Sequence, residues 1–246
     1  MTKTCLQVFS SVEELAAYFT AKLKEILSQS GNTVPISVAL SGGSTPKAIF
    51  EYIANNDTGI PWNKIQLFWG DERCVSPEST ESNYRMAKEH LLKHIPLSTS
   101  NIFRIKGEEA PVAEAQRYAE TVVKLVPQQN QVPQFDIILL GLGEDGHTAS
   151  LFPGSTELLQ SHQLFEATEH PVTGQKRITA TLKLINNAKT IFFLVTGESK
   201  AKMVGRILKR KNNWKQLPAA MVQPINGENI WLLDEKAAGQ LTNLKH

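Results

Sequence analysis

Several features that define large protein classes are scarce or missing in this chain of 246 residues. Its only cysteines, Cys5 and Cys74, are too few for a disulfide framework, which is typical of a reducing compartment. No apolar run approaches the roughly 20 residues that a membrane-spanning helix needs, and no signal-peptide core follows the N-terminus. The formal net charge of +2 lacks the basic excess of nucleic-acid-binding proteins. These absences predict a cytoplasmic protein that binds neither membranes nor nucleic acid.

Two glycine-rich nucleotide-binding fingerprints are also missing. The chain contains neither G-x-x-x-x-G-K-[ST] nor G-x-G-x-x-G, which argues against a P-loop and against a dinucleotide-dependent oxidoreductase. It also has no internal repeat, no low-complexity tract and no stretch that reads as a flexible linker. Since α/β folds of this length often form one domain, we expect residues 1–246 to be a single domain.

Short apolar runs, typical of buried strands, alternate along the chain with segments of helical periodicity. The strand candidates are residues 6–9, 36–40, 65–69, 101–105, 135–140, 177–182, 189–195 and 230–233. Asp234 follows the last of them and is expected to cap a terminal helix. The alternation predicts a single-domain α/β fold: a modified doubly wound, Rossmann-like, mostly parallel sheet flanked by helices.

A carboxylate and an imidazole follow the strand candidate 135–140. The segment 135–154 reads FDIILLGLGEDGHTASLFPG, so Asp145 and His147 come directly after the strand and its Gly-rich turn. Ligands of open α/β sheets bind outside the carboxyl ends of the strands. Histidine titrates near neutral pH and is the usual general base. The spacing fits a catalytic pair, or else a polar turn with a surface histidine.

A second strand end carries the features of an anion site. The run SGGSTP, residues 41–46, joins the strand 36–40 to a helical pattern. Glycines at 42 and 43 allow close approach of a ligand, and Ser44 or Thr45 is expected to cap the helix. The amides and hydroxyls there suit a phosphate. The alternative is an ordinary capped turn.

Charged residues gather at two more strand ends. Asp71, Glu72 and Arg73 follow the strand 65–69 and form either a solvated loop or a site in which Arg73 clamps a phosphate or stabilises an oxyanion. Asn83 either enters the same crevice or caps the next helix. Lys200 lies in a first helical turn, where it opposes the helix dipole unless an anion binds nearby.

Six blocks in the same order resemble the family of 6-phosphogluconolactonase, which belongs to a wider group with glucosamine-6-phosphate deaminase. The blocks are SGGSTP at 41–46, GDERCV at 70–75, ESNY at 81–84, GLGEDGHTASLFPG at 141–154, RIT at 177–179 and GESKA at 197–201. The resemblance implies hydrolysis of 6-phospho-D-glucono-1,5-lactone, the second step of the oxidative pentose phosphate pathway. It implies no metal and no organic cofactor. We expect a monomer or a weak homo-oligomer.

The resemblance also suggests roles for the candidate residues. His147 would be the general base on water, with Asp145 orienting its ring and Arg73 stabilising the carbonyl oxygen. The phosphate would be held by Gly43, Ser44, Thr45, Asn83, Arg177 and Lys200.

Two alternatives remain open. The deaminase pattern places a glutamate five residues after the histidine, whereas this chain has Phe152 there, although it retains Asp71. A non-catalytic sugar-phosphate sensor is the other alternative, but the chain shows no accompanying DNA-binding module.

Overall fold

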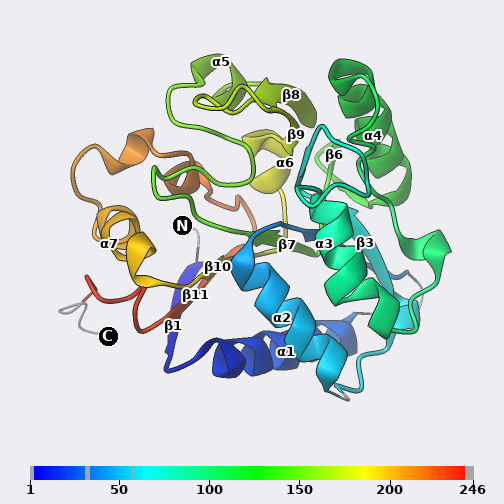
Figure 1. Ribbon diagram of the computed structural model, residues 1–246, viewed down its shortest axis with the longest axis horizontal. Coiled ribbons are helices and arrows are strands. Elements are labelled where there is room, and N and C mark those ends of the chain that lie inside the picture. The colour runs from blue at the N-terminus through cyan, green and yellow to red at the C-terminus, as the bar shows by residue number, and fades with distance from the viewer. Residues whose placement is uncertain (1–2, 31–33, 57, 242–246) are drawn as a thin grey trace.

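The computed structural model describes residues 3–30, 34–56 and 58–241, and a parallel sheet of six strands lies at its centre (Figure 1). The strand order is β1-β11-β10-β7-β2-β3. Their bounds are β1 Lys3–Phe9, β11 Glu228–Asp234, β10 Thr190–Val195, β7 Ile137–Leu140, β2 Ile36–Leu40 and β3 Ile65–Trp69. Every neighbouring pair in this sheet is parallel. The predicted fold class, a mostly parallel sheet flanked by helices, is confirmed.

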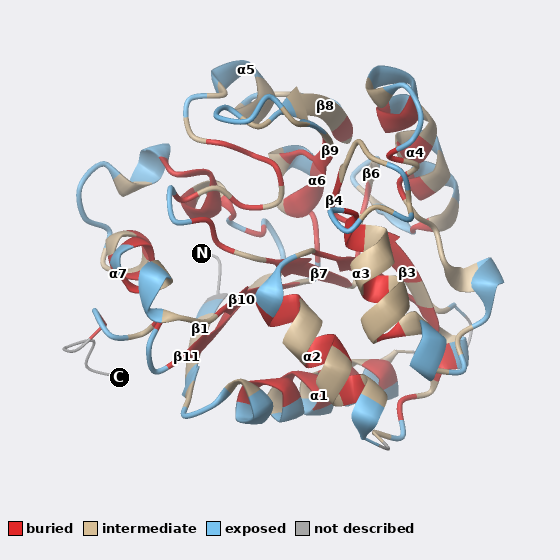
Figure 2. Cartoon of the chain, in the orientation of Figure 1, coloured by how far each residue is buried: buried red, intermediate tan, exposed pale blue. Residues whose placement is uncertain are grey.

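Helices pack on both faces of this sheet, so its inner strands have almost no polar positions. All residues of β2 and β7 are buried, as Figure 2 shows for the centre of the molecule. On one face Phe19 packs edge-on against Phe192 of β10, with 5.3 Å between ring centroids. The next residue, Phe193, stacks on Trp231 of β11 at 4.1 Å. A single cluster of buried apolar residues results, which supports our proposal of one domain.

The bounds of the helices are α1 Val12–Gln29, α2 Ser44–Asn55, α3 Asn83–His90, α4 Pro111–Leu125, α5 Thr156–Leu159, α6 Leu182–Ile185 and α7 Ala201–Leu208. Ser11 caps α1 by accepting a hydrogen bond from the amide of Glu14. None of the described helices is long and apolar enough to cross a membrane.

A smaller antiparallel sheet, which the sequence did not reveal, stands beside the parallel one. It contains β4 Asp71–Arg73, β9 Lys176–Ala180 and β8 Phe165–Glu169, in that order. Its strands β4 and β9 pair residues about a hundred positions apart, such as Arg73 with Arg177, whereas β8 and β9 are neighbours in the chain. A two-stranded ladder of β5 Gln128–Gln129 and β6 Val132–Pro133 precedes β7.

Two element predictions were wrong. Residues 101–105 do not form a strand: a 3₁₀ turn, Thr99–Asn101, leads into one isolated bridge from Ile102 to Leu67. The segment 235–240 forms turns and no helix. Asp234 still acts as a cap there, because its carboxylate accepts hydrogen bonds from the amides of Ala237 and Gly197.

Candidate active site

Loops at the carboxyl ends of β2, β3, β7 and β10 surround a cavity of about 210 Å³. This is the position expected for a ligand site in an open α/β sheet. Eight of the nine residues proposed from the sequence line the cavity: Gly43, Ser44, Thr45, Arg73, Asn83, His147, Arg177 and Lys200. Asp145 does not line it and lies behind His147, to which it is hydrogen-bonded.

The carboxylate of Asp145 contacts both the imidazole and the backbone amide of His147. Its Nδ1 lies 2.6 Å from Asp145 Oδ1, and the backbone amide of His147 donates to the same oxygen at 3.1 Å. Burial would raise the pKa of Asp145, but the amide and the imidazole of His147 outweigh this and hold that pKa below its usual range. An ionised Asp145 requires Nδ1 to carry a proton, so the other ring nitrogen, Nε2, has a lone pair available for proton transfer.

A tight turn brings these two side chains together. The amide of Gly143 donates to the carbonyl of His147 at 2.8 Å, and that of Gly146 donates to the carbonyl of Gly143 at 3.0 Å. Gly146 has a φ of 92°, in the left-handed region that favours glycine. On its other side the imidazole contacts the buried ring of Phe152, with 5.0 Å between centroids.

The predicted anion site begins a helix, but its cap differs from the prediction. The N-cap of α2 is Gly43, with a φ of 109°, and Ser44 is already the first helical residue. No side chain caps this end. Thr45 instead shares a hydrogen bond of 2.7 Å with Thr196 at the end of β10. The first amides of α2 have no acceptor within the helix, which leaves them suited to an anion.

Two guanidinium groups lie side by side at the opposite wall of the cavity. Arg73 and Arg177 are register partners on β4 and β9. Arg73 donates to the carbonyl of Glu81, and Arg177 donates to Gln175 Oε1 at 2.9 Å. The Nε of each arginine is buried without a hydrogen-bond partner among the described residues. Burial, together with the charge of Arg73, lowers the pKa of Arg177 below its usual range. An anion bound between the two guanidinium groups would accept hydrogen bonds from the unpartnered Nε atoms and would offset the repulsion between the two positive charges.

A buried polar network, which sequence reasoning missed, supports this wall. Asp71 accepts a hydrogen bond from Ser150 Oγ at 2.7 Å, and Asn83 donates from Nδ2 to the carbonyl of Asp71 at 3.0 Å. The carboxylate of Glu72 is only 2% exposed and accepts from the amides of Arg73, Asn83 and Tyr84, and from Ser82 Oγ. Burial raises the pKa of Glu72, although these donors oppose the shift. Glu72 therefore fixes the start of α3, and with it Asn83.

Lys200 lies at the N-cap of α7, as its sequence position suggested. Its Nζ is 3.7 Å from Glu144 Oε1, so a carboxylate partly offsets its charge. Burial, together with the nearby Glu72, raises the pKa of Cys74 to about 11, which is unfavourable for a nucleophilic thiolate. The described residues contain no group of three or more His, Cys, Asp or Glu side chains arranged to hold a metal ion.

The family model for glucosamine-6-phosphate isomerases/6-phosphogluconolactonase matches residues 9–231. A 6-phosphogluconolactonase of Haemophilus influenzae is 42% identical over 205 residues, 82% of this chain and 86% of that protein. One of Synechocystis is 39% identical over 232 residues, covering 94% and 93% of the two chains.

Solved structures give the same result. The 6-phosphogluconolactonase of Trypanosoma brucei superposes with a TM-score of 0.86 at 32% identity, over 98% of this chain and all of that one. A monomeric glucosamine-6-phosphate deaminase shares the fold, with a TM-score of 0.79 at 21% identity over 97% of this chain and all of that one. The resemblance seen in the six sequence blocks is thereby confirmed, and the chain belongs to the glucosamine-6-phosphate isomerase/6-phosphogluconolactonase family.

Proposed function

We propose that this protein hydrolyses 6-phospho-D-glucono-1,5-lactone to 6-phosphogluconate, the second step of the oxidative pentose phosphate pathway. The names of its relatives support the prediction that it is a lactonase hydrolase. The observation that carries the proposal is the His147–Asp145 pair beside a cavity that is also lined by the first residues of α2.

His147 acts in this proposal as the general base. Its Nε2 removes a proton from the water that attacks the lactone carbonyl, and later returns a proton to the ring oxygen as the C–O bond breaks. Asp145 keeps the Nδ1 proton in place and stabilises the imidazolium that forms. A positioned general base contributes about 10²- to 10⁴-fold in rate. A δ-lactone is an activated ester, so no covalent nucleophile is needed.

The cationic groups divide between the two ends of the substrate. The 6-phosphate binds at the first amides of α2, with Ser44, Thr45 and Lys200 around it. Arg73 stabilises the carbonyl oxygen as negative charge develops on it, and Arg177 beside it extends the positive surface toward the phosphate.

The deaminase alternative is disfavoured by the surroundings of His147. The position at which the deaminase pattern has a glutamate is Phe152, whose buried ring lies against the imidazole. No carboxylate from that position can therefore assist ring opening. Asp71, the retained acid, is held by Ser150 and Asn83.

A paired assay tests the proposal. Purified protein receives freshly made 6-phosphogluconolactone in one arm, with 6-phosphogluconate followed through its dehydrogenase, and glucosamine 6-phosphate in the other, with ammonia followed. We expect acceleration over spontaneous opening in the first arm alone, and loss of about 10²-fold or more of it in a folded His147→Ala variant. Ammonia in the second arm would establish the deaminase. Binding of sugar phosphates without turnover in either arm would establish a sensor.

A further inference from the structure

The charge of the chain is distributed unevenly, although its total is nearly zero. Residues 199–227 contain seven of the 26 Lys and Arg residues and none of the 24 Asp and Glu residues. The rest of the chain therefore carries a formal net charge of −5. Since the proposed substrate carries a phosphate dianion, the segment 199–227 attracts it, whereas outside this segment the net charge is unfavourable and the attraction comes from local groups such as Arg73 and Arg177 in the cavity wall.

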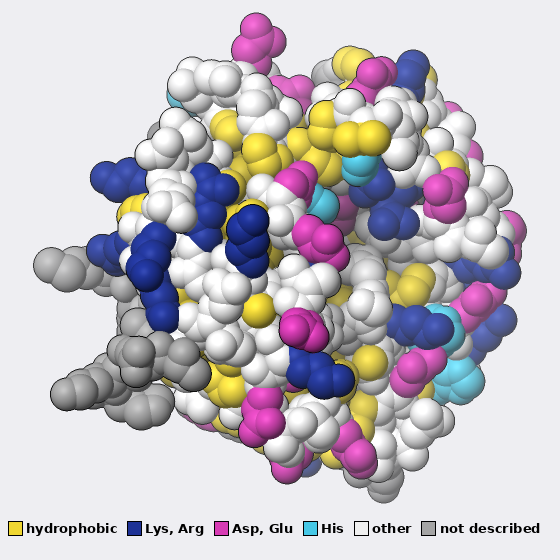
Figure 3. Space-filling view, turned by 60° about the vertical axis from the view of Figure 1, so that its left-hand side comes forward, with side chains coloured by type: hydrophobic (Ala, Val, Ile, Leu, Met, Phe, Trp, Pro, Cys, Tyr) yellow, Lys and Arg dark blue, Asp and Glu magenta, His cyan; other side chains and the backbone are white. Residues whose placement is uncertain are grey.

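The basic segment is folded around α7, whose start lines the cavity. Lys200 lies in the cavity wall, and α7 begins at the next residue. Four side chains further along, Lys202, Arg206, Lys209 and Lys211, line one groove of about 510 Å³. We name these four the basic face. Figure 3 shows Lys and Arg side chains gathered on the left of the view, where α7 comes forward.

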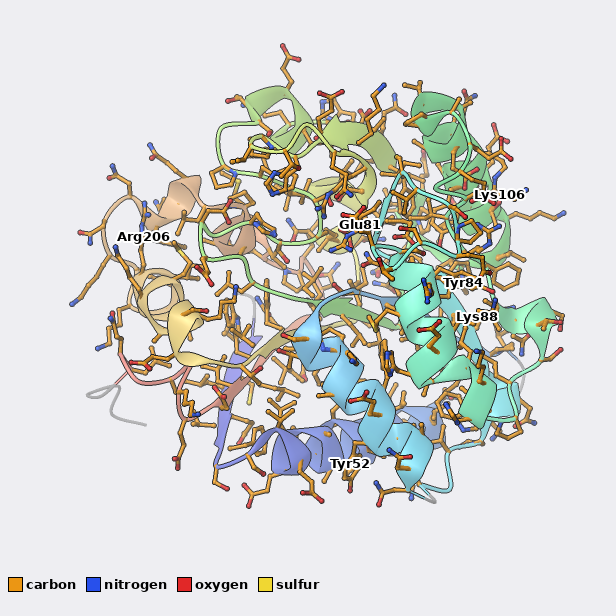
Figure 4. The ribbon with its side chains drawn as sticks, in the orientation of Figure 1. Tyr52, Glu81, Tyr84, Lys88, Lys106 and Arg206 are labelled. Atoms are coloured by element: carbon orange, nitrogen blue, oxygen red, sulfur yellow. The ribbon has the colours of Figure 1, made fainter. Side chains whose placement is uncertain are left out.

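Backbone contacts hold the basic face in place. Arg206 donates from Nε to the carbonyl of Asn212 at 2.7 Å, and the amide of Lys211 donates back to the carbonyl of Arg206 at 2.9 Å. Figure 4 shows Arg206 on the α7 side of the molecule. No carboxylate of the described residues forms an ion pair with Lys202, Arg206 or Lys211. Their charges are therefore not neutralised by an ion pair, and the guanidinium of Arg206 is held against the chain that follows α7.

The basic face is close enough to act on a ligand in the cavity. An α-helix rises about 1.5 Å per residue and has a diameter of about 10–12 Å with its side chains. The charged ends of Lys202 and Arg206 thus lie on the order of 10–15 Å from that of Lys200. Lys211 lies at about the same distance, because its amide is bonded to the carbonyl of Arg206. The Debye length is about 8 Å in physiological salt and about 30 Å at 0.01 M. Attraction across this distance is therefore modest in physiological salt and strong in dilute buffer.

We propose that the basic face draws phosphorylated lactones to the cavity and so selects them over neutral lactones before any contact with Ser44 or Arg177 is made. This inference rests on the proposed function, because the phosphorylated lactone is the ligand that the field would attract. Long-range attraction of this kind raises kcat/KM without altering kcat, since it acts before the chemical step.

The test is the double variant Lys202→Glu/Lys211→Glu, which changes the local charge by four units without touching the cavity lining. A screened Coulomb interaction with a dianion at about 14 Å predicts that kcat/KM falls about ten-fold at 0.01 M ionic strength and about two-fold at 0.15 M. The expected kcat is unchanged. Hydrolysis of unphosphorylated gluconolactone is expected to be unaffected.

A matched control changes the net charge equally on another side of the molecule. Lys93→Glu/Lys124→Glu places the same charges just after α3 and in α4, away from α7 (Figure 1). We expect this control to keep kcat/KM within about two-fold at either salt concentration. Equal losses in the two double variants, or a loss at α7 that does not depend on salt, would overturn the inference.

Binding of 6-phosphogluconate, measured by calorimetry across the same salt series, separates this inference from the proposed function. If the wild-type protein fails to hydrolyse the lactone, the proposed function is wrong, and the salt dependence of binding still decides the role of the basic face. If binding loses its salt dependence only in Lys202→Glu/Lys211→Glu, the inference stands. If binding responds alike in every variant, or is absent, the inference is refuted.

Discussion

Gly143 gives the sharpest test of the proposed general base, because replacing it disturbs His147 without removing any reactive group. A Cβ at position 143 would lie 2.1 Å from His147 Nδ1 and 2.6 Å from Asp145 Oδ1. Carbon needs about 3.5 Å from such atoms, so the imidazole must move by about 1.4 Å. The backbone of Gly143 has no positive φ, so alanine adds no backbone strain.

The expected loss follows from this displacement. A misplacement of about 1 Å at a catalytic group costs about 10²-fold in rate. We therefore expect Gly143→Ala to lower kcat by at least about 10²-fold, approaching the value for His147→Ala. The assay is lactone hydrolysis coupled to 6-phosphogluconate dehydrogenase, with thermal unfolding followed on the same samples. The imidazole is partly exposed and can swing outward, so the fold should survive.

Gly141→Ala is the matched control for this test. Nothing lies within 4 Å of a Cβ at position 141, although the residue belongs to the same turn and lines the same cavity. We expect its kcat to stay within about three-fold of wild type, whatever the change in KM. If folded Gly143→Ala matches this control in kcat, the geometry of His147 does not govern turnover and the general-base mechanism is wrong.

Two further substitutions test the surroundings of the site. Gly42→Ala would place a Cβ 1.9 Å from Asn83 Oδ1, so we expect displacement of Asn83 and a KM about ten-fold higher in steady-state kinetics. Tyr118→Phe removes the hydroxyl that accepts from the amide of Trp69, and urea unfolding should show a loss of about 1–3 kcal/mol with kcat unchanged. Burial raises the pKa of Tyr118, so as pH rises above about 10, where an exposed tyrosine ionises, the wild-type protein loses a contribution to stability that Tyr118→Phe does not have. The stability difference between wild type and Tyr118→Phe should therefore shrink from pH 8 to pH 10.5, and a constant difference would contradict that reasoning.

The parallel sheet was predictable because each of its strands has a strong local signal. Residues 137–140 are a continuous apolar run, residues 36–40 are apolar except for Ser37, and both segments are buried along their whole length. The segment 101–105 also contains apolar residues, Ile102, Phe103 and Ile105, but forms only an isolated bridge at Ile102. Whether such a segment becomes a strand depends on whether it pairs with a neighbouring strand, and the amino-acid composition of the segment does not determine this pairing.

The candidate site was predictable where its contacts are local. Asp145 and His147 are two residues apart, so one turn is enough to join them. The contacts that support the site are distant in sequence: Thr45 bonds Thr196, and Ser150 bonds Asp71. None of these four residues stands out within its own segment of the sequence, and only the folded chain brings the partners together.

The positions of the three charged residues 71–73 follow from the alternation of side chains along a strand. Alternate residues of a strand point to opposite faces, so Asp71 and Arg73 of β4 reach the cavity together. Glu72 must then point away, and its buried carboxylate meets the first amides of α3. Those amides have no acceptor within the helix, and they favour a negative charge. One short strand thus places an acid and a cation in the cavity, and its middle residue anchors the helix that presents Asn83 beside them.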